Sequence, residues 1–330
     1  MREKPRRGNR GQVHRDAVAK KQAPQRAARA QGRAEAKARR EQAGTARDAR
    51  TGDARSGGAP VRRQRAEPAT AGSAAAYRAR PSAARGLGGE QVEGRRAVRE
   101  LLIAGRRRVR DVWIADGQDE SPLLLEIVDL ATDARIPLRR VARTRIDGEA
   151  RTDAPQGVLA HADPLPEAEL EDLAVPGAFL LCLDGITDPH NLGAVLRTAE
   201  CAGVTGVVVP KHRAAHITPT VAKAAAGAVE YLPIAVVPGI PGALRDLAQA
   251  GVWSIGLDAD APTGIFAMDF DVADTSVALV LGAEGAGLSR LARQRCDLLA
   301  SIPQRGAIDS LNVSAAAAVA CFEVARRRSS

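Results

Sequence analysis

Cysteine and aromatic residues are scarce in this sequence of 330 residues, of which only 2% are aromatic. Its four cysteines, Cys182, Cys201, Cys296 and Cys321, lie far apart and form no C-x-x-C pair. This spacing excludes a disulfide scaffold and a zinc ribbon, and it predicts reduced thiols. The chain also lacks an apolar run near 20 residues and an apolar segment behind Met1, so we expect a cytoplasmic protein with no membrane span.

The first 85 residues contain no Leu, Ile, Phe or Trp. They cannot bury enough apolar surface to offset a backbone entropy cost of about 1–2 kcal/mol per residue. They carry 23 Lys and Arg against 7 Asp and Glu, a net charge of +16, whereas the other 245 residues have a net charge of −7. We therefore predict a disordered Arg- and Ala-rich tail over residues 1–88. Counterion release favours RNA or the ribosome as its partner, and a solubilising extension or a compositional bias is the alternative.

Residues 89–162 have the pattern of a small α/β domain. Apolar residues at helical spacing mark Val92–Leu102, and Ser121 with Pro122 marks the start of a helix that reaches Ala131. Strands are expected at three places: Val109–Ala115, Ile136–Leu138 and Gly157–His161. Residues 163–177 hold three prolines among acidic residues and predict a linker.

Two arginine clusters, within residues 106–110 and 139–145, lie at the expected loops of this small domain. Such runs are usually solvated surface charge, but next to a cationic tail they favour an RNA-binding face. The scarcity of aromatics argues against a platform that stacks single-stranded bases. Recognition of RNA backbone and shape is therefore the expected mode.

Residues 178–330 alternate apolar runs with helical stretches. Buried strands are predicted at residues 179–183, 204–209, 232–237, 252–257, 277–281 and 298–302. Helices are predicted at residues 192–202, 219–230 (with Thr218 as N-cap), 241–250, 288–295 and 313–327. This alternation predicts a mostly parallel sheet covered on both faces, with ligands bound beyond the carboxyl ends of its strands.

Three segments that follow expected strands carry polar or glycine-rich patterns: Asp184–Ala199, Leu281–Leu288, and Ile302–Gln304 with Ser310–Ser314. Each is weak by itself, because Asn191, Ser310 and Asn312 are also common helix N-caps and Arg197 could pair with Glu200 on the surface. The glycines of the second segment have the wrong order for a dinucleotide fingerprint, and no G-K-[ST] follows them.

Taken in order, these segments resemble the three motifs of the SpoU/TrmH family of RNA ribose 2'-O-methyltransferases, in the SPOUT superfamily. The motifs correspond to Asn191–Ala199, to Leu281–Leu288, and to Ile302-Pro303 followed by Ser310–Ser314. This likeness covers residues 178–327. Residues 90–162 are similar to the small ribosomal-protein-like RNA-binding domain that precedes the catalytic domain in one branch of the family. That second likeness rests mainly on Val92–Leu102.

The resemblance implies an α/β fold, with a methyltransferase domain over residues 178–330, a C-terminal trefoil knot and a homodimer. It implies S-adenosylmethionine as the methyl donor, without a metal. The family's cofactor contacts carry over to Gly282, Ile302 and Leu311. Its catalytic roles carry over to five residues: Asn191, Arg197, Glu284, Ser310 and Asn312.

A guanidinium keeps its proton at neutral pH, which makes arginine a poor general base. We therefore expect Arg197 to clamp an RNA phosphate and to stabilise the alkoxide that develops on the ribose. Asn191 and Asn312 would position the ribose and the cofactor.

The resemblance implies an enzyme that 2'-O-methylates 23S ribosomal RNA, either free or in a pre-ribosomal particle, at a guanosine of the peptidyl-transferase region. Methylation of tRNA or of an rRNA adenosine is the alternative within the family. A non-catalytic rRNA-binding assembly factor is the alternative from another class, and the intact motif residues argue against it.

Overall fold

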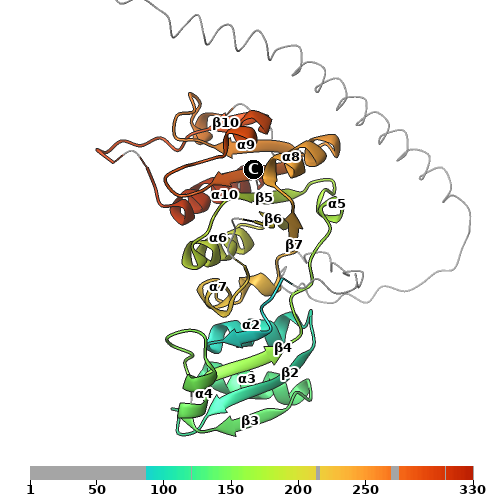
Figure 1. Cartoon of the computed structure of the whole chain (residues 1–330), viewed down its shortest axis with the longest axis vertical. Coiled ribbons are helices and arrows are strands. Elements are labelled where there is room, and N and C mark those ends of the chain that lie inside the picture. The colour runs from blue at the N-terminus through green and yellow to red at the C-terminus, as the bar shows by residue number, and fades with distance from the viewer. Residues whose placement is uncertain (1–86, 120, 213–215, 269–274, 309, 330) are drawn as a thin grey trace, which may run out of the picture. The chain divides into compact units, whose positions relative to one another are not determined.

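Two β-sheets, each covered by helices, make up the described part of the chain in a computed structural model (Figure 1). The structure describes residues 87–329, except residues 120, 213–215, 269–274 and 309. Apart from Leu87 and Gly88, the tail predicted over residues 1–88 lies outside these residues. Within them, no helix is both long enough and apolar enough to span a membrane.

The small domain, residues 87–162, has a four-stranded sheet in the order β1-β4-β2-β3, in which only β2 and β3 pair in parallel. Its elements are β1 (Gln91–Glu93), α2 (Arg95–Ala104), β2 (Val109–Ala115), α3 (Pro122–Asp133), β3 (Leu138–Val141), α4 (Arg143–Glu149) and β4 (Val158–Ala162). Alternate residues of β2 face opposite sides, as the pleat requires. Val112 and Ile114 pack with α2 and α3, whereas Trp113 packs with Ile146 of α4.

The large domain, residues 163–329, contains a six-stranded sheet in the order β10-β8-β9-β5-β6-β7. Its strands are β5 (Phe179–Asp184), β6 (Gly206–Pro210), β7 (Ile234–Val237), β8 (Trp253–Leu257), β9 (Val277–Gly282) and β10 (Leu298–Ala300). Its helices are α5 (Leu170–Leu173), α6 (Pro189–Cys201), α7 (Pro219–Ala224), η1 (Ala228–Glu230), α8 (Ile240–Gln249), η2 (Ile265–Ala267), α9 (Arg290–Arg295) and α10 (Val313–Arg328). All neighbouring strands pair in parallel, which confirms the predicted sheet.

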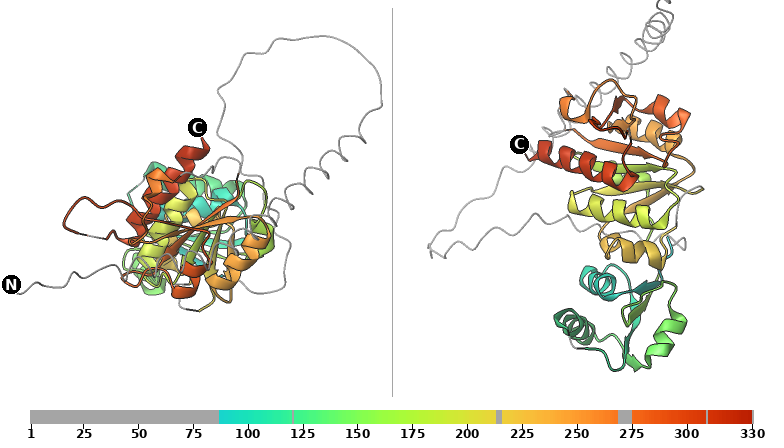
Figure 2. Two further views of the ribbon diagram at one scale, coloured as in Figure 1. Left: turned by 90° about the horizontal axis from the view of Figure 1, so that it is seen from above. Right: turned by 90° about the vertical axis from the view of Figure 1, so that its left-hand side faces the viewer.

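Helices cover both faces of this sheet (Figure 2). Helices α6, α7 and α10 pack on the face that Phe179, Leu181 and Leu183 of β5 present. Helices α5, α8 and α9 pack on the other face, against Leu180 and Cys182. Because both faces are buried, β5 has the continuous apolar run that the sequence shows.

Two segments differ from expectation. The helix predicted over residues 219–230 ends at Ala224, because Ala226 adopts a left-handed φ of 52° and a separate 3-10 turn follows. The expected cap is confirmed, since Thr218 Oγ1 accepts a hydrogen bond from Val221 N. The segment predicted as a linker, residues 163–177, contains helix α5 and buries Leu165 in the core of the large domain.

A buried ion pair joins the two domains, and all of the described residues belong to one compact unit. The guanidinium of Arg107 donates to both carboxylate oxygens of Glu230, at 2.6 and 3.0 Å. Its third nitrogen donates to the carbonyls of Gly89 and Asp163, both at 2.7 Å. The two charged side chains are only 3% and 1% exposed. Each of the three guanidinium nitrogens of Arg107 thus donates at least one hydrogen bond inside the protein.

Candidate active site

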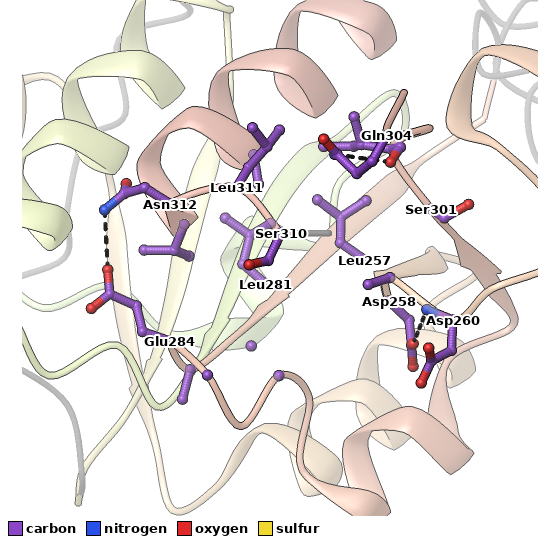
Figure 3. Close-up of a pocket in the computed structure, with 18 of the residues that line it drawn as sticks. Leu257, Asp258, Asp260, Leu281, Glu284, Ser301, Gln304, Ser310, Leu311 and Asn312 are labelled. Atoms are coloured by element: carbon purple, nitrogen blue, oxygen red, sulfur yellow. Dashed lines mark hydrogen bonds between the residues drawn. The ribbon is translucent and has the colours of Figure 1, made fainter. Parts of the chain in front are cut away.

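A cavity of about 950 Å³ lies at the carboxyl ends of β8, β9 and β10 (Figure 3). These strands are neighbours in a parallel sheet, so the segments that follow them converge at one edge. The cavity is lined mainly from four segments: residues 257–260, 281–287, 301–304 and 310–313. Three of these segments contain the motifs singled out in the sequence.

The loop after β9 presents the Glu284 side chain. Ala283 and Gly287 exchange two backbone hydrogen bonds, of 3.0 and 2.8 Å, which fold the loop back on itself. A Cβ on Gly282 would lie 2.1 Å from the carbonyl carbon of Gly287, so only glycine permits this close return of the chain. Glu284 is exposed at the tip of this loop.

Three side chains from different segments meet at the rim of the cavity. Asn191 Nδ2 donates a short hydrogen bond to Glu284 Oε1. Asn312 Nδ2 lies 3.3 Å from the same carboxylate oxygen and 3.2 Å from Asn191 Oδ1. The two amides therefore hold the Glu284 carboxylate through Oε1 and orient Oε2 for a further hydrogen bond.

Helix caps fix the two asparagines. Asp188, rather than Asn191, is the N-cap of α6, and its Oδ1 accepts from Asn191 N at 2.7 Å. Asn191 is therefore in the first turn with its amide group unused by the cap. Asn312 is the N-cap of α10, and its Oδ1 accepts from the backbone and the hydroxyl of Ser314 at 2.8 and 2.6 Å. The cap occupies Oδ1 and leaves Nδ2 for Glu284.

The structure brings together most of the residues predicted to form the site. Six line the cavity: Gly282, Glu284, Ile302, Ser310, Leu311 and Asn312. Asn191 joins them through its hydrogen bonds to Glu284 and Asn312. Arg197 lies six residues further along α6, about 240° around the helix, and it lines two other cavities. Its catalytic role therefore remains a prediction.

One wall of the cavity was missed in the sequence. Leu257 ends strand β8, Asp258 and Asp260 follow it, and Ser301 completes this side together with Gln304 of the third segment. Asp258 is oriented by Arg293 Nε at 2.8 Å and by the backbone of Asp260 at 3.0 Å. The sequence does contain one sign of this wall, because two aspartates come directly after a predicted buried strand. That strand, β8, lies beside β9 in the sheet.

The charge of the cavity favours a cationic ligand. Its described lining residues include three carboxylates, those of Asp258, Asp260 and Glu284, and no Lys, Arg or His. Arg293, outside the lining, pairs with Asp258, so the excess negative charge comes from Asp260 and Glu284. Such a site disfavours a nucleotide polyphosphate and suits the sulfonium and ammonium charges of S-adenosylmethionine. The side chains of Leu281 and Ile302 add apolar surface suited to an adenine ring, and the volume is typical of small-ligand sites. Among the described residues, no cluster of three or more His, Cys, Asp or Glu could hold a metal ion.

Comparison with known proteins agrees with this site. A model of the SpoU rRNA Methylase family matches residues 178–322. A model of an RNA 2'-O ribose methyltransferase substrate binding domain matches residues 91–168. The chain therefore belongs to the SpoU rRNA methylase family.

Relatives in this family include two named 23S rRNA (guanosine-2'-O-)-methyltransferase RlmB. The protein of Xanthomonas campestris is 43% identical over 243 residues, covering 72% of this chain and 96% of the relative. The protein of Pseudomonas putida is 39% identical over 246 residues, covering 72% and 97%. The crystal structure of the SpoU methyltransferase AviRb from Streptomyces viridochromogenes, in complex with AdoMet, matches with a TM-score of 0.61 and 27% identity. That match covers 73% of this chain and 90% of AviRb.

Proposed function

We propose that this protein transfers the methyl group of S-adenosylmethionine to the ribose 2'-hydroxyl of a guanosine in 23S rRNA. Its relatives named RlmB are 23S rRNA guanosine-2'-O-methyltransferases by name. The observation that carries the proposal is the acidic, partly apolar cavity with the Asn191–Glu284–Asn312 cluster at its rim. The sulfonium of the donor supplies a methyl group that is already electrophilic, so the protein has to position the hydroxyl and accept its proton.

The walls of the cavity would hold the donor. Leu281, Ile302 and Leu311 offer apolar contacts, while the close return of the chain at Gly282 exposes backbone groups to the ligand. Asp258 and Asp260 would hydrogen-bond hydroxyl or ammonium groups. Ser310 lines the same cavity and adds a hydroxyl next to Leu311.

The cluster at the rim would orient the ribose. Oε2 of Glu284 is directed by the two amide contacts on Oε1, and it can accept a hydrogen bond from a ribose hydroxyl. Holding two reactants in near-attack geometry is worth about 7–11 kcal/mol. Arg197 would bind an RNA phosphate and stabilise charge on the reacting oxygen, since a guanidinium does not release its proton at neutral pH.

We infer that the protein acts as a cytoplasmic homodimer. Helix α10 carries exposed apolar residues, since Phe322 is 50% exposed and Ala315 is exposed seven residues before it, and Leu311, just ahead of the helix, is 42% exposed. Apolar residues at this spacing form one face of the helix and support pairing with a second copy. Methyl transfer to free rRNA and to a pre-ribosomal particle, measured side by side, identifies which of them is the substrate.

Methyl transfer from labelled S-adenosylmethionine tests the proposal. Unmodified 23S rRNA, pre-ribosomal particles and bulk tRNA are the substrates, and Arg197→Ala is the control. We expect one rRNA guanosine to become resistant to alkaline cleavage on its 3' side, and this signal to vanish in the control. Transfer to tRNA alone, or to an rRNA adenosine, would show that the guanosine of 23S rRNA is not the substrate, and would identify the substrate instead. If the protein neither transferred the methyl group nor bound S-adenosylmethionine, the result would favour a non-catalytic rRNA-binding assembly factor.

Substitution of Asn312 separates its role in the site from its role as a cap. Asn312→Ser retains an N-cap oxygen but loses the amide donor to Glu284. We expect turnover to fall at least about tenfold, because the lost hydrogen bond to a charged group is worth about 1.5–3 kcal/mol. The melting temperature should stay within about 2 °C of wild type. Normal turnover in Asn312→Ser would remove the cluster from the mechanism.

A further inference from the structure

A second cavity, of about 660 Å³, is lined by residues of both domains and is distinct from the acidic cavity. Its lining includes the first turn of α2, the start of α4, and side chains from α6 and α7. Five basic side chains contribute to it: Arg95, Arg96, Arg143, Arg197 and Lys223. We refer to this cavity as the cationic groove.

The positive charges of the groove are largely uncompensated. Arg96 and Arg197 are exposed and form no ion pair with another described residue. Arg95 donates to oxygens of Gln118, Ser121 and Gln156, and Lys223 donates to oxygens of Thr152 and Ala154, all of them neutral. Arg143 has only a solvent-exposed partner, Asp147, at 3.7 Å.

The one carboxylate that lines the groove, Glu93, balances only one of its five positive charges. Glu93 is fully buried, and its oxygens accept hydrogen bonds from Gln91 Nε2, from the backbone of Arg151 and from the backbone and hydroxyl of Thr152. Its charge is therefore stabilised on the protein side. An anion in the groove would meet an excess of positive charge.

The backbone also favours an anion here. Helix α2 begins at Arg95 with no acidic residue in its first turn, and this turn lines the groove, so the positive end of the helix dipole lies at the groove, while the Arg95 amide itself donates to Gln156 Oε1 at 3.1 Å. Cations in the first turn, such as Arg95 and Arg96, work against helix stability, and a bound anion would offset this. Gln156 and Ala226, two of the three described non-glycine residues with positive φ, also line the groove. Backbone strain of this kind gathers at functional sites.

The neighbouring cavity, of about 700 Å³, has no excess of positive charge. It shares Arg96 and Arg197 with the groove, but it also exposes Glu100, Glu126 and Glu200. Its other arginine, Arg99, is neutralised by Glu100 and Glu126 at 2.5 and 2.7 Å. A phosphate chain that contacts Arg197 therefore meets a balanced set of charges on this side and an excess of positive charge towards Arg143 and Lys223.

We propose that the cationic groove binds consecutive phosphates of the substrate RNA strand and leads this strand to Arg197. The inference rests on the proposed function and adds the path of the RNA backbone across the two domains. The strand leaves Arg197 towards α4 and α7, away from the three glutamates. The groove reads charge and backbone shape, so it contributes affinity without choosing the base.

Paired charge removals on the full-length protein test the path. Arg96→Gln/Arg143→Gln removes two groove charges, and Arg135→Gln/Arg290→Gln removes two exposed arginines that lie outside the groove and outside both arginine clusters. Binding to a 23S rRNA transcript is measured by fluorescence anisotropy between about 50 and 200 mM salt. For the groove pair we expect the salt slope to fall by about 1.4, since each phosphate contact to a single strand contributes about 0.7.

Kinetics supply the second readout. The groove pair should raise KM for RNA about tenfold while kcat and the affinity for S-adenosylmethionine stay at wild-type values, and the control pair should change none of these. The proposal would be overturned if both double variants lost RNA affinity equally, or if the salt slope of RNA binding were unchanged in the groove pair. The wild-type protein is measured in the same methyl-transfer assay, so a failure of the proposed function is seen separately from a failure of the groove.

Discussion

The buried pair Arg107–Glu230 makes a strong prediction about how the two domains are held together. Glu230→Gln keeps the size of the side chain but removes its charge, which leaves the guanidinium of Arg107 buried without a counter-charge. Arg107 cannot turn to solvent without losing its bonds to Gly89 and Asp163. Removing one partner of such a pair costs about 3–5 kcal/mol, and the 3% and 1% exposures place this pair in that class.

The double variant Arg107→Met/Glu230→Leu is the matched control. It removes both charges and fills the space with apolar groups, and replacements of this kind are often neutral or stabilising. We therefore expect the double variant to be at least about 2 kcal/mol more stable than Glu230→Gln. A coupling of this size and sign would show that the unpaired charge, rather than lost packing, destabilises the single variant.

The two tryptophans provide one probe for each domain, because Trp113 lies in β2 and Trp253 in β8. Urea unfolding of Trp113→Phe and Trp253→Phe backgrounds then follows the large and the small domain separately. We expect the two transitions to separate in Glu230→Gln, since the contact that couples them is weakened. A Glu230→Gln protein within about 0.5 kcal/mol of wild type in both probes would refute the reasoning.

Three further predictions concern the cofactor loop, acid stability and thiol reactivity. Gly282→Ala should weaken S-adenosylmethionine binding at least about tenfold in calorimetry, because the new Cβ forces the loop open, whereas Gly242→Ala on α8, where a Cβ meets nothing within 4 Å, should bind normally. The hydrogen bond from Arg326 lowers the pKa of Glu323 to about 2, so its contribution to stability is complete above pH 4.5 and is lost as the pH falls towards 2. Because the Arg326 side chain is 63% exposed, solvent screening limits this contribution to about 1 kcal/mol. Glu323→Gln should flatten the corresponding pH dependence of the urea midpoint, whereas an equal slope in the variant would contradict the prediction. Cys201, the exposed thiol among the four cysteines, should react with a thiol reagent in the folded protein much faster than the others, and simultaneous modification of all four would contradict the described burial.

The large domain was predictable because its strands are buried on both faces. Continuous apolar runs placed all six of its strands within about two residues, and the alternation with helices gave the parallel sheet. The break in the helix predicted over residues 219–230 could not be seen, because Ala226 is a helix-forming residue that tertiary contacts hold at a φ of 52°. The short elements β1, α4 and α5 were missed for a related reason, since three to seven residues give too little periodicity.

The site was predictable where a motif marks it. Gly282, Glu284 and Asn312 do line one cavity, but Asp258 and Asp260 carry no motif and become visible only when β8 is placed beside β9. Spacing along a helix explains the position of Arg197, because six residues place its side chain about 120° from that of Asn191 around the helix axis. The direction of a side chain therefore depends on the helix that carries it as well as on its motif.

The contact between Asn191 and Asn312 joins residues 121 positions apart, which has a consequence during protein synthesis. At about 5–20 residues per second, the ribosome needs about 6–24 s to add the second asparagine after the first. During this interval the sheet can form around β5 and β6, but the cluster at the rim of the cavity lacks its last member. Helix α10 must then dock against α6 before Glu284 is held by both amides. The nascent chain thus acquires its RNA-facing domain well before it acquires a complete active site.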